Sequence, residues 1–122
     1  MTHLMVLVVD DNLVSRLLPS FILRPFSQQV QVLECESGAE ALRMLESHQV
    51  THVLLDISMP ELDGVQVAQT IRGTAKSPKV RLIAYTADAL VAKESYLKSV
   101  GFDEVLLKPL QSESLLKALG LT

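Results

Sequence analysis

Five short apolar segments recur along the chain and predict five β-strands. Four of them span residues 4–9, 50–55, 80–85 and 105–107, and none of these four alternates cleanly between apolar and polar positions. The fifth, at residues 30–35, is weaker in pattern. Continuous apolar strands are typical of a parallel sheet that is covered on both faces. The pattern therefore favours strands buried inside a layered α/β fold.

Helical patterns fill the segments between these strands. The first helix runs from Leu13 to about Leu23, and the second opens with a capping box in which Ser37 is the N-cap and Glu40 follows three residues later. Gly101 and Gly120 are expected to end the fourth and fifth helices. The last three helices are indicated by apolar residues at helical spacing, namely Val65, Ala68 and Ile71, then Leu90, Tyr96, Leu97 and Val100, then Leu115, Leu116 and Leu119.

Strands that alternate with helices imply parallel strands joined by right-handed crossovers. The 122 residues are the length of one ordinary domain. We therefore expect residues 1–122 to form a single domain, a doubly wound three-layer α/β sandwich. The sequence contains no internal repeat, low-complexity segment or linker.

Composition narrows the class of protein. The net charge is −3 and no basic patch stands out, which argues against direct binding to nucleic acid. No apolar run reaches the roughly 18 residues of a membrane-spanning helix, and the first residues lack the features of a signal peptide. The single cysteine, Cys35, can form no internal disulfide and is expected in the core. These observations favour a cytoplasmic protein.

Polar residues follow four of the predicted strands. They lie beyond the carboxyl ends of these strands, which is where ligands bind in open α/β sheets. Asp10 and Asp11 come after the first strand, and the third, fourth and fifth end in Asp56, Thr86 and Lys108. Three carboxylates, one hydroxyl and one ammonium are thus expected at one edge of the sheet.

The expected chemistry of this edge is phosphoryl transfer. Two carboxylates about 4 Å apart repel by about 4 kcal/mol at an effective dielectric constant of about 20, and a bound cation relieves that repulsion. Oxygen ligands on loops suit Mg²⁺. Lys108 and Thr86 can each contact an anionic oxygen, and a carboxylate nucleophile would form an acyl phosphate.

At these positions the chain resembles the receiver domains of bacterial response regulators and hybrid histidine kinases. The resemblance covers nearly the whole chain, and four motifs carry it, in order and each at a predicted strand end: Val8-Val9-Asp10-Asp11-Asn12, Leu55-Asp56-Ile57-Ser58-Met59-Pro60-Glu61-Leu62-Asp63-Gly64, Ala84-Tyr85-Thr86-Ala87-Asp88 and Leu107-Lys108-Pro109. The resemblance implies a flavodoxin-like (βα)5 sandwich with a five-stranded parallel sheet in the order 2-1-3-4-5.

The resemblance also implies a role for each site residue. Asp56 would be the phosphoacceptor. Asp11 would bind Mg²⁺ directly, together with Asp56 and the backbone carbonyl of Ser58, and Asp10 would help to hold the ion. Thr86 and Lys108 would bind the phosphoryl oxygens. The Lys108–Pro109 peptide bond would be cis, and Asp63-Gly64 would open the third helix.

The resemblance further implies the partners. The phosphoryl donor would be a phosphohistidine on a histidine kinase or on a histidine phosphotransfer protein. The domain would catalyse only its own phosphorylation and dephosphorylation, and its output would be a contact with another protein or onward phosphorelay. A homodimer through the fourth and fifth helices is possible by resemblance, and so is an origin as a fragment of a hybrid kinase. Val105 departs from the family, since many receivers carry an aromatic switch residue there.

Other interpretations of these features stay open at this level. The chain could be a pseudo-receiver, an interaction module without phosphotransfer. An aspartate-nucleophile phosphatase usually has Asp-x-Asp after the first strand, and a flavodoxin-like flavin carrier needs a phosphate-binding loop rich in Ser, Thr and Gly there. The sequence at this point is Asp10-Asp11-Asn12, so both classes fit less well. Asp10-Asp11 could be a solvated turn with an N-cap, and Thr86 could cap the fourth helix. His48 and His52 are four apart, but a strand begins between them, so no metal role is expected.

The first predicted helix has more apolar residues than one buried stripe requires. It is either tilted and largely buried, or it presents an apolar surface to a partner. Pro19 should kink or split it.

Overall fold

The computed structural model describes residues 3–58, 64–73, 80–87 and 93–121. Strands and helices alternate as predicted: β1 Leu4–Val9, α1 Leu13–Leu23, the 3₁₀ turn η1 Arg24–Phe26, β2 Val30–Cys35, α2 Gly38–Ser47, β3 His52–Asp56, α3 Gly64–Arg72, β4 Arg81–Thr86, α4 Glu94–Ser99, β5 Glu104–Leu107 and α5 Ser112–Ala118. The predictions for residues 59–63, including the Asp63 that was to open the third helix, and for Asp88 and Leu90 lie outside the described residues.

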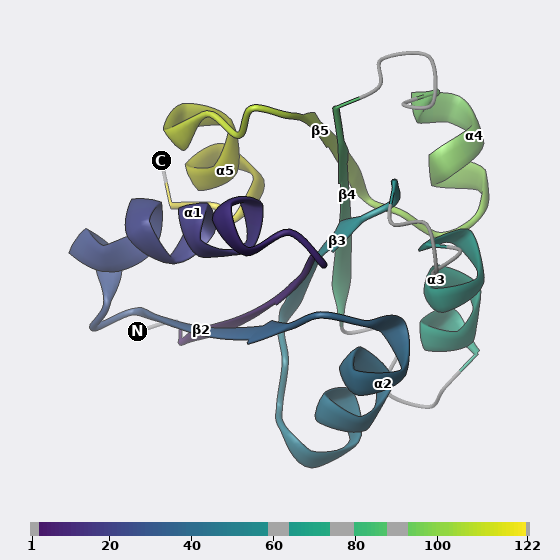
Figure 1. The fold of residues 1–122 in the computed structure, drawn as a ribbon, viewed down its shortest axis with the longest axis horizontal. Helices are drawn as coiled ribbons and strands as arrows, with labels where there is room; N and C mark the ends of the chain where they lie inside the picture. Colours follow the sequence, from purple (N-terminus) through teal and green to yellow (C-terminus); the bar gives the residue numbers. More distant parts are fainter. Residues whose placement is uncertain (1–2, 59–63, 74–79, 88–92, 122) are drawn as a thin grey trace.

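The sheet is parallel, with strand order β2-β1-β3-β4-β5. Helices α1 and α5 cover one face, and α2, α3 and α4 cover the other (Figure 1). The predicted flavodoxin-like doubly wound (βα)5 sandwich is confirmed.

Two apolar cores explain why the strand sequences do not alternate. Val6 and Val8 of β1 belong to the core beneath α1 and α5, whereas Leu7 and Val9 belong to the core beneath α2, α3 and α4. All four side chains are fully buried. Since both faces of the sheet are covered, every position in the central strands favours an apolar residue.

Three strands differ from the predicted bounds by one or two residues. The pairing of Val6 with His52 shifts β3 to His52–Asp56, and β4 and β5 begin at Arg81 and Glu104. Val50 and Val80 are still buried, but they precede the paired residues. The shift places Asp56 and Thr86 inside the strands, as their last residues, so the sheet itself fixes their backbones.

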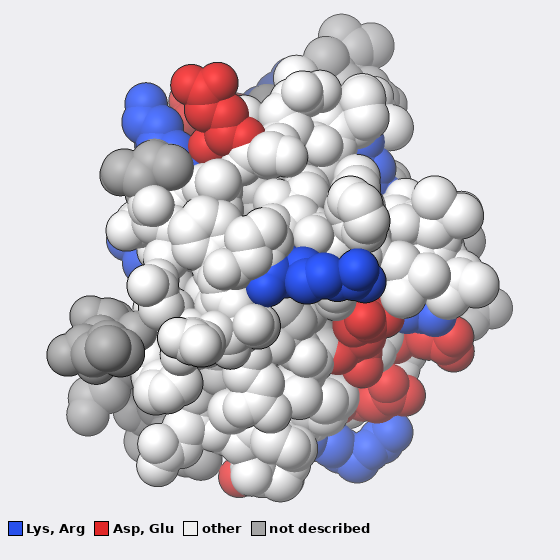
Figure 2. Space-filling model, turned by 90° about the vertical axis from the view of Figure 1, so that its left-hand side faces the viewer, with Lys and Arg blue, Asp and Glu red and all other residues white. Residues whose placement is uncertain are grey.

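Of the two alternatives for helix α1, the structure shows the exposed apolar surface and not the largely buried helix. The side chains of Leu13, Val14, Leu17 and Phe21 are exposed by 57%, 77%, 47% and 66%. Pro19 does not split the helix, which runs unbroken from Leu13 to Leu23. Buried Pro19 and Leu23, with Leu18 and Ile22 packed beside them, attach the helix to the sheet. Much of the face toward which the end of α1 points carries neither acidic nor basic side chains, although one basic side chain crosses its middle and a group of charged side chains lies beside it (Figure 2).

The predicted N-cap Ser37 and the two predicted glycine stops are confirmed. Ser37 is the N-cap of α2, and its hydroxyl accepts a hydrogen bond from the backbone N–H of Glu40 at 3.2 Å. Gly101 and Gly120, just after α4 and α5, have φ angles of 120° and 74°, which favour glycine.

Arg72, the last residue of α3, joins three elements at the amino edge of the sheet. Its guanidinium donates to the backbone carbonyls of Gly101 and Val80 at 2.9 and 2.7 Å and to the Asp103 carboxylate at 2.6 Å. The same Asp103 oxygen accepts the backbone N–H of Leu82 at 2.9 Å. One side chain therefore ties α3 to β4 and to the loop that precedes β5.

We expect Arg72→Ala to lower the free energy of unfolding by about 2–3 kcal/mol, because it leaves partly buried acceptors without their donor. Arg81→Ala is the matched control, since the Arg81–Glu104 ion pair at 3.7 Å is about half exposed. It should cost less than about 1 kcal/mol. Urea unfolding of both variants measures the difference, and equal losses would contradict the assigned role of Arg72.

Candidate functional site

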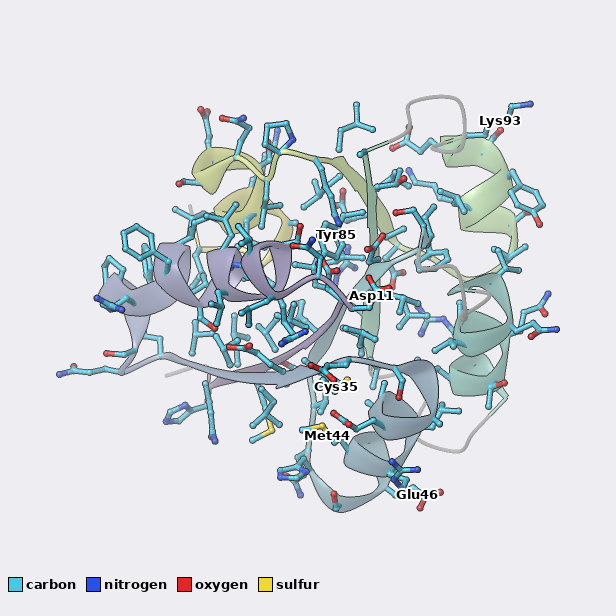
Figure 3. The ribbon with its side chains drawn as sticks, viewed as in Figure 1. Asp11, Cys35, Met44, Glu46, Tyr85 and Lys93 are labelled. Atoms are coloured by element: carbon cyan, nitrogen blue, oxygen red, sulfur yellow. The ribbon has the colours of Figure 1, made fainter. Side chains whose placement is uncertain are left out.

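The polar residues predicted to meet do so at the carboxyl edge of the sheet. Asp10 follows β1, Asp56 and Thr86 end β3 and β4, and Lys108 follows β5. Asp10, Asp56 and Thr86 are buried, Lys108 is half-buried and Asp11 is exposed. In Figure 3, Asp11 and Tyr85 mark this edge, near the start of α1.

Lys108 lies between two of the carboxylates. Its ammonium is 3.2 Å from Asp10 Oδ2 and 3.1 Å from Asp56 Oδ2. The backbone N–H of Lys108 donates to the carbonyl of Thr86 at 2.8 Å, and the Lys108–Pro109 peptide bond is cis, as predicted. The cation thus offsets part of the repulsion between Asp10 and Asp56.

Asp56 is held as an ionised carboxylate. Burial by itself would raise its pKa, but hydrogen bonds from Ser58 and the nearby Lys108 ammonium outweigh burial and hold the pKa below its ordinary value. The backbone N–H and the hydroxyl of Ser58 donate to Asp56 Oδ1 at 2.9 and 2.6 Å. Asp56 is therefore a carboxylate at neutral pH, which is the form a nucleophile requires.

Asp10, Asp11 and Asp56 form the one group of three or more candidate metal ligands in the described part of the chain. Each offers a carboxylate oxygen, and the three oxygens lie within 4.8 Å of one another. An all-oxygen donor set of this kind matches the preference of Mg²⁺. The donor set therefore fits the implied ion, and Asp10, Asp11 and Asp56 are the residues that would hold it.

Two residues that sequence reasoning missed complete the site. The first is Tyr85, which is 1% exposed and donates a hydrogen bond from its hydroxyl to Asp10 Oδ2. Burial and the adjacent Asp10 carboxylate raise the pKa of Tyr85, so the hydroxyl stays protonated and acts as a donor. The signal that could have found it was a tyrosine one position before Thr86 in an otherwise aliphatic strand, because a buried tyrosine hydroxyl requires a partner.

The second missed residue is Arg16, the only charged residue in α1. Its guanidinium donates to the backbone carbonyl of Asp10 at 2.9 Å and lies 3.4 and 3.3 Å from the carboxylates of Glu34 and Glu36. A lone arginine in an apolar helix, with two acidic residues near the end of the second strand, was the available signal. Arg16 ties α1 and β2 to the loop that carries Asp10.

The alternative interpretations of single residues fit the structure less well. Asn12 is the N-cap of α1, accepting from the backbone N–H of Ser15 at 3.0 Å, so Asp10 and Asp11 are not its cap. Helix α4 has Lys93 at its N-cap position, so Thr86 does not cap it. His48 follows the end of α2 and His52 begins β3, so the helical spacing of the two histidines is broken. Burial and the charge of Glu40 raise the pKa of Cys35 to about 12, which keeps this thiol protonated.

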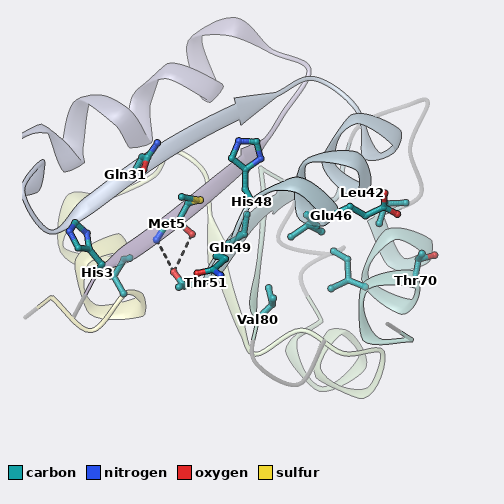
Figure 4. Close-up of a pocket in the computed structure, with 14 residues that line it drawn as sticks. His3, Met5, Gln31, Leu42, Glu46, His48, Gln49, Thr51, Thr70 and Val80 are labelled. Atoms are coloured by element: carbon teal, nitrogen blue, oxygen red, sulfur yellow. Dashed lines mark hydrogen bonds between the residues drawn. The ribbon is translucent and has the colours of Figure 1, made fainter. Parts of the chain in front are cut away.

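A hollow lies at the opposite edge of the sheet (Figure 4). It encloses about 1150 Å³ between the starts of the strands and the ends of α2 and α3, and Met5, Glu46, His48 and Thr51 are among its lining residues. It includes none of Asp10, Asp11, Asp56, Thr86 and Lys108. The cluster of polar and charged groups at the carboxyl edge is therefore separate from this hollow.

Comparisons with known proteins agree with this geometry. The model of the response regulator receiver domain family matches residues 6–120. The signal transduction histidine-protein kinase BarA of Escherichia coli strain K12 is 30% identical over 110 residues, which are 90% of this chain but 12% of that kinase.

Among solved structures, the receiver domain of the sensor histidine kinase PA1611 from Pseudomonas aeruginosa is 28% identical, with a TM-score of 0.83 over 97% of this chain and 95% of that one; it carries a magnesium ion in its active-site cleft. The co-crystal structure of the Saccharomyces cerevisiae phosphotransfer protein Ypd1 with the receiver domain of Ssk1 also matches. The matched chain of that structure is 22% identical to this chain, with a TM-score of 0.83 over 96% of this chain and 86% of that one. At this identity the match supports the fold alone.

The chain belongs to the response regulator receiver domain family of two-component signalling. It is similar to the receiver domains of hybrid histidine kinases, and it spans about an eighth of the length of the curated relatives it matches. The family is a class of signalling phosphoacceptors. No helix among the described residues is both long and apolar enough to cross a membrane.

Proposed function

We propose that this chain accepts a phosphoryl group on Asp56, with Mg²⁺ held by Asp10, Asp11, Asp56 and the backbone carbonyl of Ser58. The observation that carries the proposal is the position of Lys108, 3.1 Å from an ionised Asp56 and beside the three-carboxylate cluster. The magnesium-bound receiver of PA1611 supports the choice of ion. We also propose a cytoplasmic location, a single domain over residues 1–122, and no catalytic activity beyond the domain's own phosphorylation and dephosphorylation.

The residues divide the chemistry between them. An Asp56 oxygen attacks phosphorus, a P–O bond forms, and the P–N bond of phosphohistidine breaks with its electron pair returning to the imidazole ring. When bound, Mg²⁺ supplies positive charge that stabilises the phosphoryl oxygens. Lys108 releases Asp10 and Asp56 and binds a phosphoryl oxygen, and the Thr86 hydroxyl binds another. Ser58 orients Asp56 through its two hydrogen bonds until the attack.

The test is the intact mass of the protein after incubation with MgCl₂ and phosphoramidate. The proposal requires the addition of one phosphoryl group, which EDTA prevents. If no phosphate is added, while Mg²⁺ and beryllofluoride also fail to bind, the chain is a pseudo-receiver that works through its surface.

We further propose that the donor is a histidine kinase or a histidine phosphotransfer protein that docks on α1. The exposed side chains of Leu13, Val14, Leu17 and Phe21 offer an apolar surface beside the site, since α1 begins three residues after Asp10. The Ssk1 receiver, which shares the fold, was crystallised with a phosphotransfer protein. We propose a downstream protein as the target of the signal, and a homodimer through α4 and α5 as a secondary proposal.

We expect Val14→Ser combined with Phe21→Ser to slow phosphotransfer from a phosphorylated histidine phosphotransfer protein at least about tenfold, since interface anchors of this kind contribute most of the binding energy. The rate with phosphoramidate should stay unchanged, because that donor needs no docking. Tyr96→Ser, which changes an exposed aromatic residue on α4, is the control. Equal rates with the protein donor for wild type and the double variant would rule out docking on α1.

A further inference from the structure

The Asp10 carboxylate has donors on both of its oxygens. Asp10 Oδ1 accepts the backbone N–H of Asn12 at 2.9 Å, and Oδ2 accepts both the Tyr85 hydroxyl and the Lys108 ammonium. The residue is 0% exposed. A cation that approaches Asp10, directly or through a water molecule, must therefore share or displace one of these donors.

The Tyr85 hydroxyl is well placed to resist that displacement. Its ring is buried in the core formed with Leu54, Ile83 and Leu115 and has little freedom to move, whereas Lys108 is on a flexible stem. The Lys108 ammonium also lies 4.7 Å from the centre of the Tyr85 ring, so both donors to Oδ2 belong to one packed group. Of the two, only the lysine can leave without disturbing the core.

We propose that Tyr85 is a positioning residue of the phosphoacceptor site, whose hydroxyl occupies Asp10 Oδ2 and thereby weakens the binding of Mg²⁺. This inference rests on the proposed function, because it concerns the same carboxylates.

Two physical effects each predict that the Tyr85 hydroxyl weakens the binding of Mg²⁺. The hydroxyl uses acceptor capacity on Asp10 that the ion, or a water bound to the ion, would otherwise use. A hydrogen bond to a buried carboxylate also stabilises the metal-free state, in which the Tyr85 hydroxyl, the Asn12 N–H and the Lys108 ammonium together offset the lost hydration of that charge. Removing the hydroxyl therefore takes away one of the two donors to Asp10 Oδ2 and destabilises the metal-free form more than the metal-bound form. Both changes tighten the binding of Mg²⁺.

The test compares Tyr85→Phe with wild type in a Mg²⁺ titration followed by amide chemical shifts. Tyr85→Phe keeps the ring and removes only the hydroxyl, and Tyr96→Phe, on the exposed face of α4, is the matched control. We expect the Mg²⁺ dissociation constant of Tyr85→Phe to fall about three- to tenfold, which is the size of the net contribution of one ordinary intramolecular hydrogen bond. Tyr96→Phe should match wild type.

A second measurement does not depend on chemical shifts. Without Mg²⁺, the thermal unfolding midpoint of Tyr85→Phe should be lower than that of wild type. The same high concentration of Mg²⁺ should raise the midpoint of Tyr85→Phe by more than it raises that of wild type, because stabilisation by a ligand grows as the dissociation constant falls. An unchanged or larger dissociation constant for Tyr85→Phe overturns the inference.

The outcomes separate this inference from the proposed function. If wild type binds Mg²⁺ and is phosphorylated, and Tyr85→Phe has the wild-type dissociation constant, only the role of Tyr85 is wrong. If wild type neither binds Mg²⁺ nor takes up phosphate, the proposed function is wrong and the inference falls with it.

Discussion

The Asp56→Asn protein is expected to take up no phosphoryl group from phosphoramidate and Mg²⁺, under conditions in which wild type takes up one. Asparagine has nearly the same shape and can still accept the Ser58 backbone N–H, so the loop should keep its conformation. The amide lacks the anionic oxygen that the structure holds ionised beside Lys108. Intact mass spectrometry of the two proteins, after equal incubation, measures the difference.

Glu36→Gln is the control for this substitution. It also removes one carboxylate near the carboxyl edge of the sheet, but Glu36 is exposed and contacts Arg16, not Lys108. It should be phosphorylated like wild type. Phosphate on Asp56→Asn, located by peptide mapping to Asp10 or Asp11, would show that the acceptor has been misassigned.

Replacement of Lys108 by alanine is expected to slow phosphorylation by about 10²- to 10³-fold while Mg²⁺ still binds. The loss is the size found when one preorganised donor to a developing negative charge is removed. The ammonium also bridges Asp10 and Asp56, so its removal leaves two buried carboxylates without their shared cation. The binding of Mg²⁺ should become tighter, and the metal-free protein should lose about 3 kcal/mol or more of stability.

The experiment on Lys108 is specific because the substitution is expected to slow phosphorylation and, at the same time, to tighten the binding of Mg²⁺. Phosphorylation rates come from a time course of intact mass, and the Mg²⁺ dissociation constant comes from calorimetry on the same protein. Lys98→Ala, which removes an exposed lysine of α4 that pairs with Glu94, should leave both quantities unchanged. A wild-type rate for Lys108→Ala would show that this ammonium does not contact the phosphoryl group.

The sequence predicted the order of strands and helices and the positions of the site residues because both depend on strong local signals. Apolar runs bounded by Asp10, Asp56, Thr86 and Lys108 locate the carboxyl ends of the strands, and parallel strands bring those ends together. The four motifs then indicated the sheet order through family resemblance. Strand bounds were less accurate, because Val50 and Val80 are buried without being paired in the sheet.

The two residues that were missed, Tyr85 and Arg16, show what a local pattern leaves undetermined. A strand buried on both faces has no alternation to indicate which way a side chain points, so the contact of Tyr85 with Asp10, 75 positions away in the chain, left no periodic signal. The burial of Arg16 likewise depends on β2 bringing Glu34 beside α1. The exposure of α1 was undetermined for a related reason, since Leu13, Val14, Leu17 and Phe21 could equally have packed inward.

The placement of the two tyrosines gives this protein a built-in optical reporter. The chain has no tryptophan, so its near-ultraviolet absorption and emission come mainly from Tyr85 and Tyr96. Tyr96 is exposed on α4, whereas the Tyr85 ring lies under an ammonium and its hydroxyl is bonded to a carboxylate. In a Tyr96→Phe protein, one chromophore therefore remains to report the arrival of a cation or phosphate beside it. Tyrosine emission could then follow the reaction in real time, without a dye.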